Sequence, residues 1–143
     1  MLRVDTMSRR KAGDGMRRSA LAAMAAGILL FGSAHALAGP WEDGMVAYNS
    51  GDYLPAIRLF RPLAEQGNPK AQTQIGTMYR KGEGLTASLT RAFMWFSVAA
   101  RRGDAKARAG LREVSKTMTP AEMSQAKAMA DACAASNYRA CEY

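Results

Sequence analysis

Histidine and cysteine are scarce in this chain. Of its 143 residues, one is histidine, His35, and two are cysteine. We expect His35 to be removed with a signal peptide, which leaves no imidazole for a Ser-His-Asp or Cys-His catalytic site or for a histidine metal site. Two cysteines cannot supply the four ligands of a structural zinc site. The sequence therefore predicts a protein that is not an enzyme, with no catalytic residues, no metal and no cofactor.

An apolar run long enough to span a membrane is also missing. The longest uncharged apolar run, residues 19–31, has about 13 residues, whereas a spanning helix needs about 20. It follows the basic stretch Met16-Arg17-Arg18 and precedes the small residues "AHALA", which is the order found in a secretory signal peptide. We expect cleavage after Ala38, with cleavage after Ala36 and an uncleaved membrane anchor as the alternatives.

No cysteine stands where a bacterial lipoprotein signal would end, because Gly39 is followed by Pro40. We therefore expect a periplasmic or secreted protein without a lipid and without a stable membrane anchor after cleavage. The first 15 residues fit neither a signal peptide nor a domain, so translation starts at Met1 or at Met16. The predicted parts are an N-terminal extension with signal peptide and one folded domain, residues 1–38 and 39–143.

Strong positive charge is absent from the predicted mature chain. The formal net charge of +8 falls to +4 because residues 1–38 hold six basic and two acidic side chains. A nucleic-acid-binding protein needs Lys and Arg clustered on one face. We therefore expect no nucleic acid as a partner.

Strand patterns are missing as well, since no stretch alternates apolar and polar residues and no Asn-Gly or Asp-Gly turn joins two apolar runs. The chain instead shows helical spacing between glycine turns, with Pro62 as an interior residue that we expect to kink its helix. The predicted fold is all-α, with about six helices after the signal peptide. They begin near Pro40 and then cover 53–66, 69–81, 89–102, 105–116 and 120–133.

Two similar segments, 36 positions apart, each have the pattern of a corner where one helix ends and the next begins: "AEQGNPKAQ" (64–72) and "AARRGDAKAR" (99–108). Gly67 and Gly103 suit the left-handed residue that ends a helix, and Asn68 and Asp104 suit the cap of the next one. A repeat of this length in a helical chain indicates a solenoid, in which neighbouring units bury each other's faces.

The segments "AQTQIGTMYRKGEGL" (71–85) and "RAFMWFSVAARRGDAKA" (91–107) resemble the Sel-1-like repeat, a relative of the tetratricopeptide repeat. The repeat positions are Ala71, Gly76, Tyr79, Gly82, Gly84, Ala92, Trp95, Ala100 and Gly103. The family's usual acidic residue is missing from 86–90, which we expect to weaken a cap without changing the fold. The resemblance implies a short α-solenoid of antiparallel helix pairs, with one complete repeat. Residues 41–66 resemble a tetratricopeptide-like first pair and 104–133 a closing pair.

Gly76 lies inside the predicted third helix, where glycine lowers helix stability by about 1 kcal/mol relative to alanine. We therefore expect a close approach between two helices at this position.

The third helix carries a polar face opposite its apolar one. Its members follow at helical spacing: Lys70, Gln74, Thr77 and Lys81. In tetratricopeptide-like folds the first helix of each pair lines a concave groove, so the resemblance implies that these four residues contact a partner. An ordinary solvated face is the alternative.

Cys133 and Cys141 lie eight positions apart near the end of the chain. In an oxidising compartment we expect them to form a disulfide, and a redox-active thiol pair is the alternative.

The resemblance implies an exported protein–protein interaction module, an adaptor or scaffold of the bacterial cell envelope, which binds a partner protein or peptide in its groove. An alternative is a protein of the same fold that binds or hydrolyses cell-wall fragments or β-lactams. A third hypothesis is a stability or inhibitor subunit of a larger complex.

Overall fold

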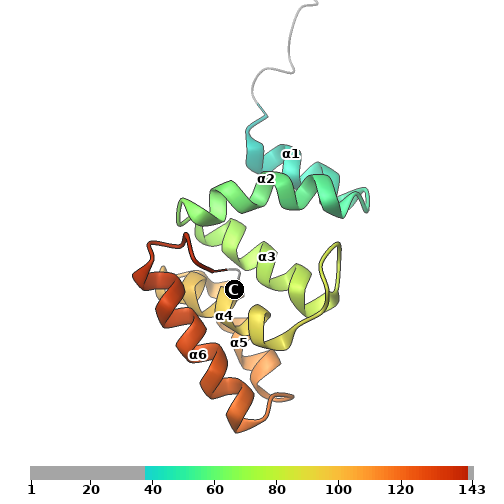
Figure 1. Cartoon of the computed structure of the whole chain (residues 1–143). Helices are drawn as coiled ribbons and strands as arrows, with labels where there is room; N and C mark the ends of the chain where they lie inside the picture. Colours follow the sequence, from blue (N-terminus) through green and yellow to red (C-terminus); the bar gives the residue numbers. More distant parts are fainter. Residues whose placement is uncertain (1–37, 142–143) are drawn as a thin grey trace, which may run out of the picture. The chain divides into compact units, whose positions relative to one another are not determined.

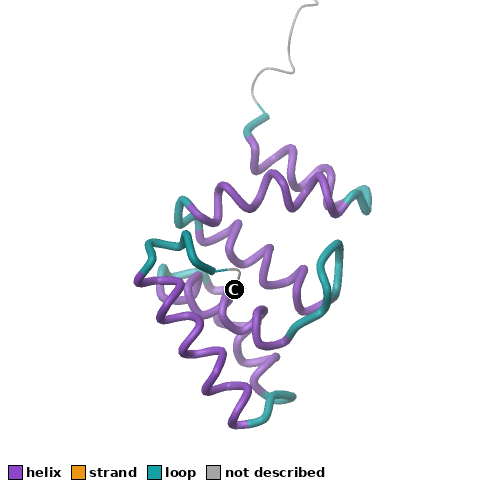
Figure 2. The backbone as a smooth tube through the Cα atoms, viewed as in Figure 1, coloured by secondary structure: helices purple, strands orange, loops and turns teal. Residues whose placement is uncertain are grey.

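The computed structural model describes residues 38–141, and every regular element among them is an α-helix (Figures 1 and 2). The predicted all-α fold is confirmed, and the observed helix ends lie within two residues of the expected ones. The predictions for residues 1–37 fall outside the described part of the chain. The helices are α1 (Pro40–Asn49), α2 (Tyr53–Glu65), α3 (Pro69–Lys81), α4 (Leu89–Arg101), α5 (Ala105–Ser115) and α6 (Pro120–Ala135). α2 continues through Pro62 to its end.

Across residues 38–141, none of the helices combines the length and the apolar character that a bilayer crossing requires.

The repeated corner ends one helix and starts the next, as the sequence indicates. Gly67 and Gly103 have φ angles of +82° and +92°, in the left-handed region that favours glycine. Asn68 Oδ1 accepts hydrogen bonds from the backbone N–H groups of Lys70 (3.0 Å) and Ala71 (3.2 Å). Asp104 caps α5 in the same way. The two corners therefore set the direction of α3 and of α5.

The helix after the glycine loop keeps a cap although the family's acidic residue is absent. Ser88 Oγ accepts a hydrogen bond from the backbone N–H of Arg91 at 3.3 Å. The fold is unchanged by that departure, and the expectation of a weaker cap stays a prediction.

Helices that follow one another pack together from α1 to α5, but the last helix does not continue this order. α6 packs on α4 and makes little contact with α5. Figure 1 shows α6 running alongside α4, with α5 behind. Residues 104–133 therefore differ from a regular antiparallel closing pair, and a gap opens between α5 and α6.

One aromatic ring of the core lies where three helices meet. Phe96 of α4 is buried, and a Cβ atom added to Gly76 of α3 would lie 2.8 Å from its ring. A Cβ on Gly110 of α5 would also lie 2.8 Å from the ring. This is the close approach that the glycine inside α3 predicts. Phe60, which precedes Phe96 by one repeat length, meets Gly44 of α1 in the same manner.

The remaining repeat positions divide into core and turn residues. Those that are buried contribute to one continuous hydrophobic cluster: Ala71, Tyr79, Ala92 and Trp95. Ala100 packs at its edge. Gly82 and Gly84, in the loop before α4, have φ angles of +75° and +70°.

The segment after α6 folds back onto the repeated corners. Cys133 and Cys141 form a disulfide with a Cα–Cα distance of 4.6 Å. The Tyr138 ring between them lies against Gly67, where an added Cβ would be 3.1 Å away. Arg102 donates a hydrogen bond to the Tyr138 hydroxyl (3.2 Å) and lies over its ring at 5.6 Å. The closing segment thus joins the corner after α2 to the corner after α4.

Candidate partner-binding groove

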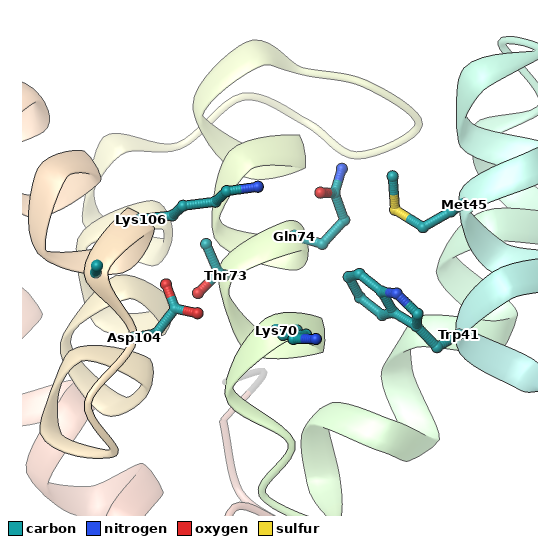
Figure 3. Close-up of a pocket in the computed structure, with 8 residues that line it drawn as sticks. Trp41, Met45, Lys70, Thr73, Gln74, Asp104 and Lys106 are labelled. Carbon is teal, nitrogen blue, oxygen red and sulfur yellow. The ribbon is translucent and has the colours of Figure 1, made fainter.

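A pocket of about 330 Å³ lies between the first helices of the three successive units. Figure 3 shows α3 in the middle, α1 on one side and the start of α5 on the other. The lining residues are Trp41 and Met45 from α1, Lys70, Thr73 and Gln74 from α3, and Asp104, Ala105 and Lys106 at the start of α5.

Three of these side chains occupy the same place in their helices. α1, α3 and α5 begin at Pro40, Pro69 and Ala105, and the second residue of each one lines the pocket. These second residues are Trp41, Lys70 and Lys106. The groove is therefore made from the first turns of three helices. Lys70 and Lys106 are also one repeat length apart, whereas Trp41 shares only its place in the helix.

The wall formed by α1 is apolar. Trp41 packs on Phe60 with ring centroids 5.2 Å apart, which fixes the indole while leaving part of it exposed. Met45 lies one helical turn further along, beside the same space (Figure 3). A fixed indole and a flexible thioether make a surface that adapts to an apolar side chain.

The wall formed by α3 offers an unused hydrogen-bond donor. Gln74 Nε2 is buried, and no acceptor within the described residues contacts it. Figure 3 shows the Gln74 side chain extending from α3 toward Trp41 and Met45. A buried donor without an acceptor costs about 1–3 kcal/mol. An acceptor supplied by a bound molecule would remove that cost.

The two lysines at the groove are exposed, while the acidic side chain there is already engaged. Lys70 and Lys106 lie on α3 and α5. Asp104 Oδ1 accepts a hydrogen bond from the backbone N–H of Ala107 at 2.7 Å, as the cap of α5. Asp104 keeps its charge as a cap, so the two lysines leave the groove with one net positive charge, and the groove favours a negatively charged or electron-rich group beside them.

The four residues predicted to contact a partner have different surroundings. Lys70 and Gln74 line the pocket. The Thr77 hydroxyl donates to the carbonyl oxygen of Thr73 at 3.0 Å, within its own helix. Lys81 lies at the far end of α3, away from the pocket lining. The structure thus brings the first two together and places the other two apart from them.

Lys81 belongs to a cluster that ties the glycine loop to α1. Its Nζ donates to the Tyr48 hydroxyl at 3.2 Å, and that hydroxyl donates to Glu83 Oε2 at 2.6 Å. Burial and the hydrogen bond to Glu83 raise the pKa of Tyr48. The hydrogen bond to Tyr48 raises the pKa of Lys81. Tyr48 is therefore the protonated donor and Lys81 the cation of a structural contact.

Sequence reasoning missed the residues contributed by α1 and α5. Lys106 lies 36 positions after Lys70, so extending the repeat by one unit would have found it. Trp41 and Met45 stand at the helix positions of Lys70 and Gln74, although their chemistry differs. Trp41 and Met45 can be identified by aligning the helix starts instead of the residue types.

Helices joined in sequence and stacked by equivalent corners define a helical-repeat protein. The sequence model of the Sel1 repeat matches residues 34–68 and 69–104, and the chain is a Sel1 repeat protein. The first match corrects the expectation of one complete repeat, because residues 41–66 lie within a Sel1 repeat of their own. Both matched segments hold one helix pair joined to the next by the glycine corner.

A 36-residue stretch is 47% identical to the uncharacterized protein NMB1327 of Neisseria meningitidis serogroup B. The match covers 25% of this chain and 8% of that protein. The chain therefore spans a small part of this relative's length, about one repeat unit.

Sel1 repeats indicate a protein–protein interaction module, and the family is typically a non-catalytic scaffold. Within residues 38–141, no three His, Cys, Asp or Glu side chains come together in a way that would hold a metal ion.

Proposed function

We propose that this protein is an exported adaptor of the bacterial cell envelope, which binds an extended segment of a partner protein in the groove between α1, α3 and α5. The observation that carries the proposal is the buried, unused Gln74 Nε2 beside Trp41. An extended peptide has a carbonyl oxygen at every residue and can supply the missing acceptor.

The groove specifies the chemistry of the partner segment. An apolar side chain of the segment packs on Trp41 and Met45, while a carboxylate lies between Lys70 and Lys106. Gln74 in the middle donates to the backbone that joins the two. We therefore expect a segment in which an acidic residue lies close to an apolar one.

The exported location is supported by two features of the chain. Residues 16–38 have the order of a signal peptide. The Cys133–Cys141 disulfide is of a kind that persists in oxidising compartments. Fractionation of expressing cells tests the location, since the exported form should be shorter at its N-terminus by the length of the signal segment.

Site-specific photocrosslinking in cells tests the groove. A photoreactive residue at Lys70 should capture one or a few partner proteins, and the same residue at Ser124, an exposed position of α6, should not capture them. Lys106→Glu should reduce capture from position 70 by at least about tenfold, because it reverses the attracting charge that remains once Lys70 is replaced. Equal capture from both positions would contradict the proposal.

A variant at Lys81 is a poor test of the groove, because a glutamate there would face Glu83 and disturb the loop. Muropeptides and β-lactams test the alternative ligand class. If they raise the melting temperature of the wild-type protein but not that of Gln74→Leu, the groove binds small molecules and the adaptor proposal is wrong.

A further inference from the structure

The gap between α5 and α6 is a second concave surface, away from the groove. It has a volume of about 530 Å³, and its floor is apolar. Phe93 of α4, Leu111 of α5 and Met123 of α6 form this floor. It exists because both outer helices pack on α4 and make little contact with each other. We refer to this surface, with its rim, as the tail trough.

The rim of the tail trough is positively charged. Arg112, Lys116 and Lys127 line it, and all three are exposed. Among the described residues, none of the three forms an ion pair with a carboxylate. Whatever covers the apolar floor must therefore also bring negative charge.

The acidic residues near the tail trough are engaged elsewhere. Glu113 pairs with Arg80 of α3, and Asp131 pairs with Arg101 of α4 at 2.5 Å. Glu122 accepts a hydrogen bond from the backbone N–H of Thr119 at 2.8 Å, which lowers its pKa. Glu113 and Asp131 are thus paired with cations outside the rim, and the three cations of the rim outnumber the one carboxylate, Glu122, that has no cation partner.

The opposite end of the unit has the complementary character. Glu42, Asp43 and Val46 lie within one turn of α1 and are exposed. Glu42 accepts a hydrogen bond from the backbone N–H of Gly39 at 3.1 Å, as Glu122 does from Thr119, and like Glu122 it keeps its negative charge. Val46 is 66% exposed, the highest value for a large apolar side chain among the described residues. It points away from the face of α1 that carries Trp41 and Met45. We refer to Glu42, Asp43 and Val46 as the head face.

An uncovered apolar residue at the end of a solenoid is unusual, because terminal repeats normally present a polar outer surface. Here one end has an apolar residue flanked by two carboxylates, and the other has an apolar trough flanked by three cations. Figure 1 shows α1 and the turn between α5 and α6 at opposite ends of the helical unit.

We propose that copies of this protein associate head to tail, with the head face of one copy seated in the tail trough of the next. Val46 contacts Phe93, Leu111 and Met123, and the carboxylates meet the cationic rim. Because the two surfaces differ, each copy keeps one free end, and the association continues into short chains. A second copy is the proposed occupant because it brings both an exposed apolar residue and acids on one helix face.

Sedimentation of the protein, purified from cells that express the whole chain, tests this association. A small charged interface corresponds to a dissociation constant of roughly 0.1–1 mM, so the weight-average mass should at least double between about 10 µM and 1 mM. Raising the salt to about 0.5 M should weaken the association severalfold. A monomer at 1 mM in low salt would overturn the proposal.

Charge reversal distinguishes a head-to-tail contact from any symmetric one. The tail variant carries Lys116→Glu and Lys127→Glu, and the head variant carries Glu42→Lys and Asp43→Lys. Each variant alone should remain monomeric, because its two ends now have like charge. An equimolar mixture should regain association, because each end then meets one of opposite sign. A mixture that stays monomeric would contradict the proposal even if the wild-type protein associates.

A control variant makes the same change of net charge elsewhere. Arg58→Glu with Arg139→Glu alters two exposed cations outside the groove and outside both surfaces, and it should associate like the wild type. Vesicles with about 30% anionic lipid test the other ligand that a cationic rim attracts. Vesicle binding that is lost in the tail variant, without self-association of the wild type, would assign the trough to a membrane and overturn the proposal.

Discussion

Phe96 holds three helices together through the two glycines on either side of its ring. Gly76 of α3 and Gly110 of α5 each come so close that a methyl group would overlap the ring. The spacing between α3 and α5, and with it the width of the groove, is therefore set by a buried residue that does not line the groove.

We expect Gly110→Ala to destabilise the protein by about 1–2 kcal/mol. Overpacking against Phe96 costs about 1–3 kcal/mol and outweighs the gain of up to about 1 kcal/mol in helix propensity. Urea unfolding at equilibrium measures the difference.

The matched control is Ser124→Ala on exposed α6, which should change stability by less than about 0.5 kcal/mol. Adding Phe96→Leu should reduce the cost of Gly110→Ala, because the smaller side chain makes room for the methyl group. An alanine at 110 that stabilises the protein would refute the close contact.

The sequence identified one of these two glycines. Gly76 lies in the stretch that resembles the family pattern, where a glycine inside a helix is informative. Gly110 lies outside that stretch, and the ring it meets is 14 positions away in another helix. Which residue faces a glycine depends on how the helices pack, and one sequence does not contain that information.

At the level of elements, helix limits were predictable because local chemistry sets them. Asn68, Asp104 and Thr119 cap their helices with side-chain oxygens, and each cap is visible as a residue type in the sequence. The position of α6 was not predictable. Its buried residues include Ala126 and Ala130, and small side chains fit the surface of α4 or α5 equally well.

The closing segment depends on its disulfide. Replacing Cys133 and Cys141 by serine should lower stability by about 2.5 kcal/mol in the chain-entropy account, because the unfolded chain regains the freedom of a short loop. Reduction of the wild-type protein should have the same effect. The thermal midpoint, measured with and without reductant, checks both expectations.

The double serine variant is its own control, since reductant should leave its midpoint unchanged. Tyr138→Ala in the oxidised protein should cost part of the same stability, because Tyr138 is the side chain that covers Gly67 and contacts Arg102. If reductant has no effect on the wild type, the closing segment does not stabilise the helices.

At the level of the whole molecule, α4 is the best supported helix. It packs against α3, α5 and α6, whereas α1 packs chiefly on α2 and α6 chiefly on α4. Local opening is easiest where few apolar contacts must be broken. The unit therefore has its firmest part at α4 and its weaker parts at the two end helices, α1 and α6.

We expect the backbone amides of α1 to exchange with deuterated water at least about tenfold faster than those of α4 at low protein concentration. At high concentration, head-to-tail association should slow exchange in α1 and in residues 111–127 together. Hydrogen exchange with mass spectrometry measures both regions in one sample. Protection in α1 equal to that in α4 in the dilute protein would contradict this order of stability.

The groove was predictable in part at this scale. The polar face of α3 could be found from helical spacing, and it supplied Lys70 and Gln74. The apolar wall could not be predicted, because Trp41 and Met45 are residue types that usually lie in a core. Their exposure follows from the distance between α1 and α3. A binding surface shared by three helices is a property of the stack.

Trp41, Lys70 and Lys106 each stand second in the first helix of their unit, and in the proposed adaptor this has a consequence for evolution. Each unit would contribute one side chain from this place, so the three would form a row of reading positions. Duplication of a unit would add one position to the row and lengthen the peptide that is read. A substitution at one of these residues would alter which residue is preferred at one position of the bound peptide. Specificity can thus change by copy number as well as by substitution, while the core stays as it is.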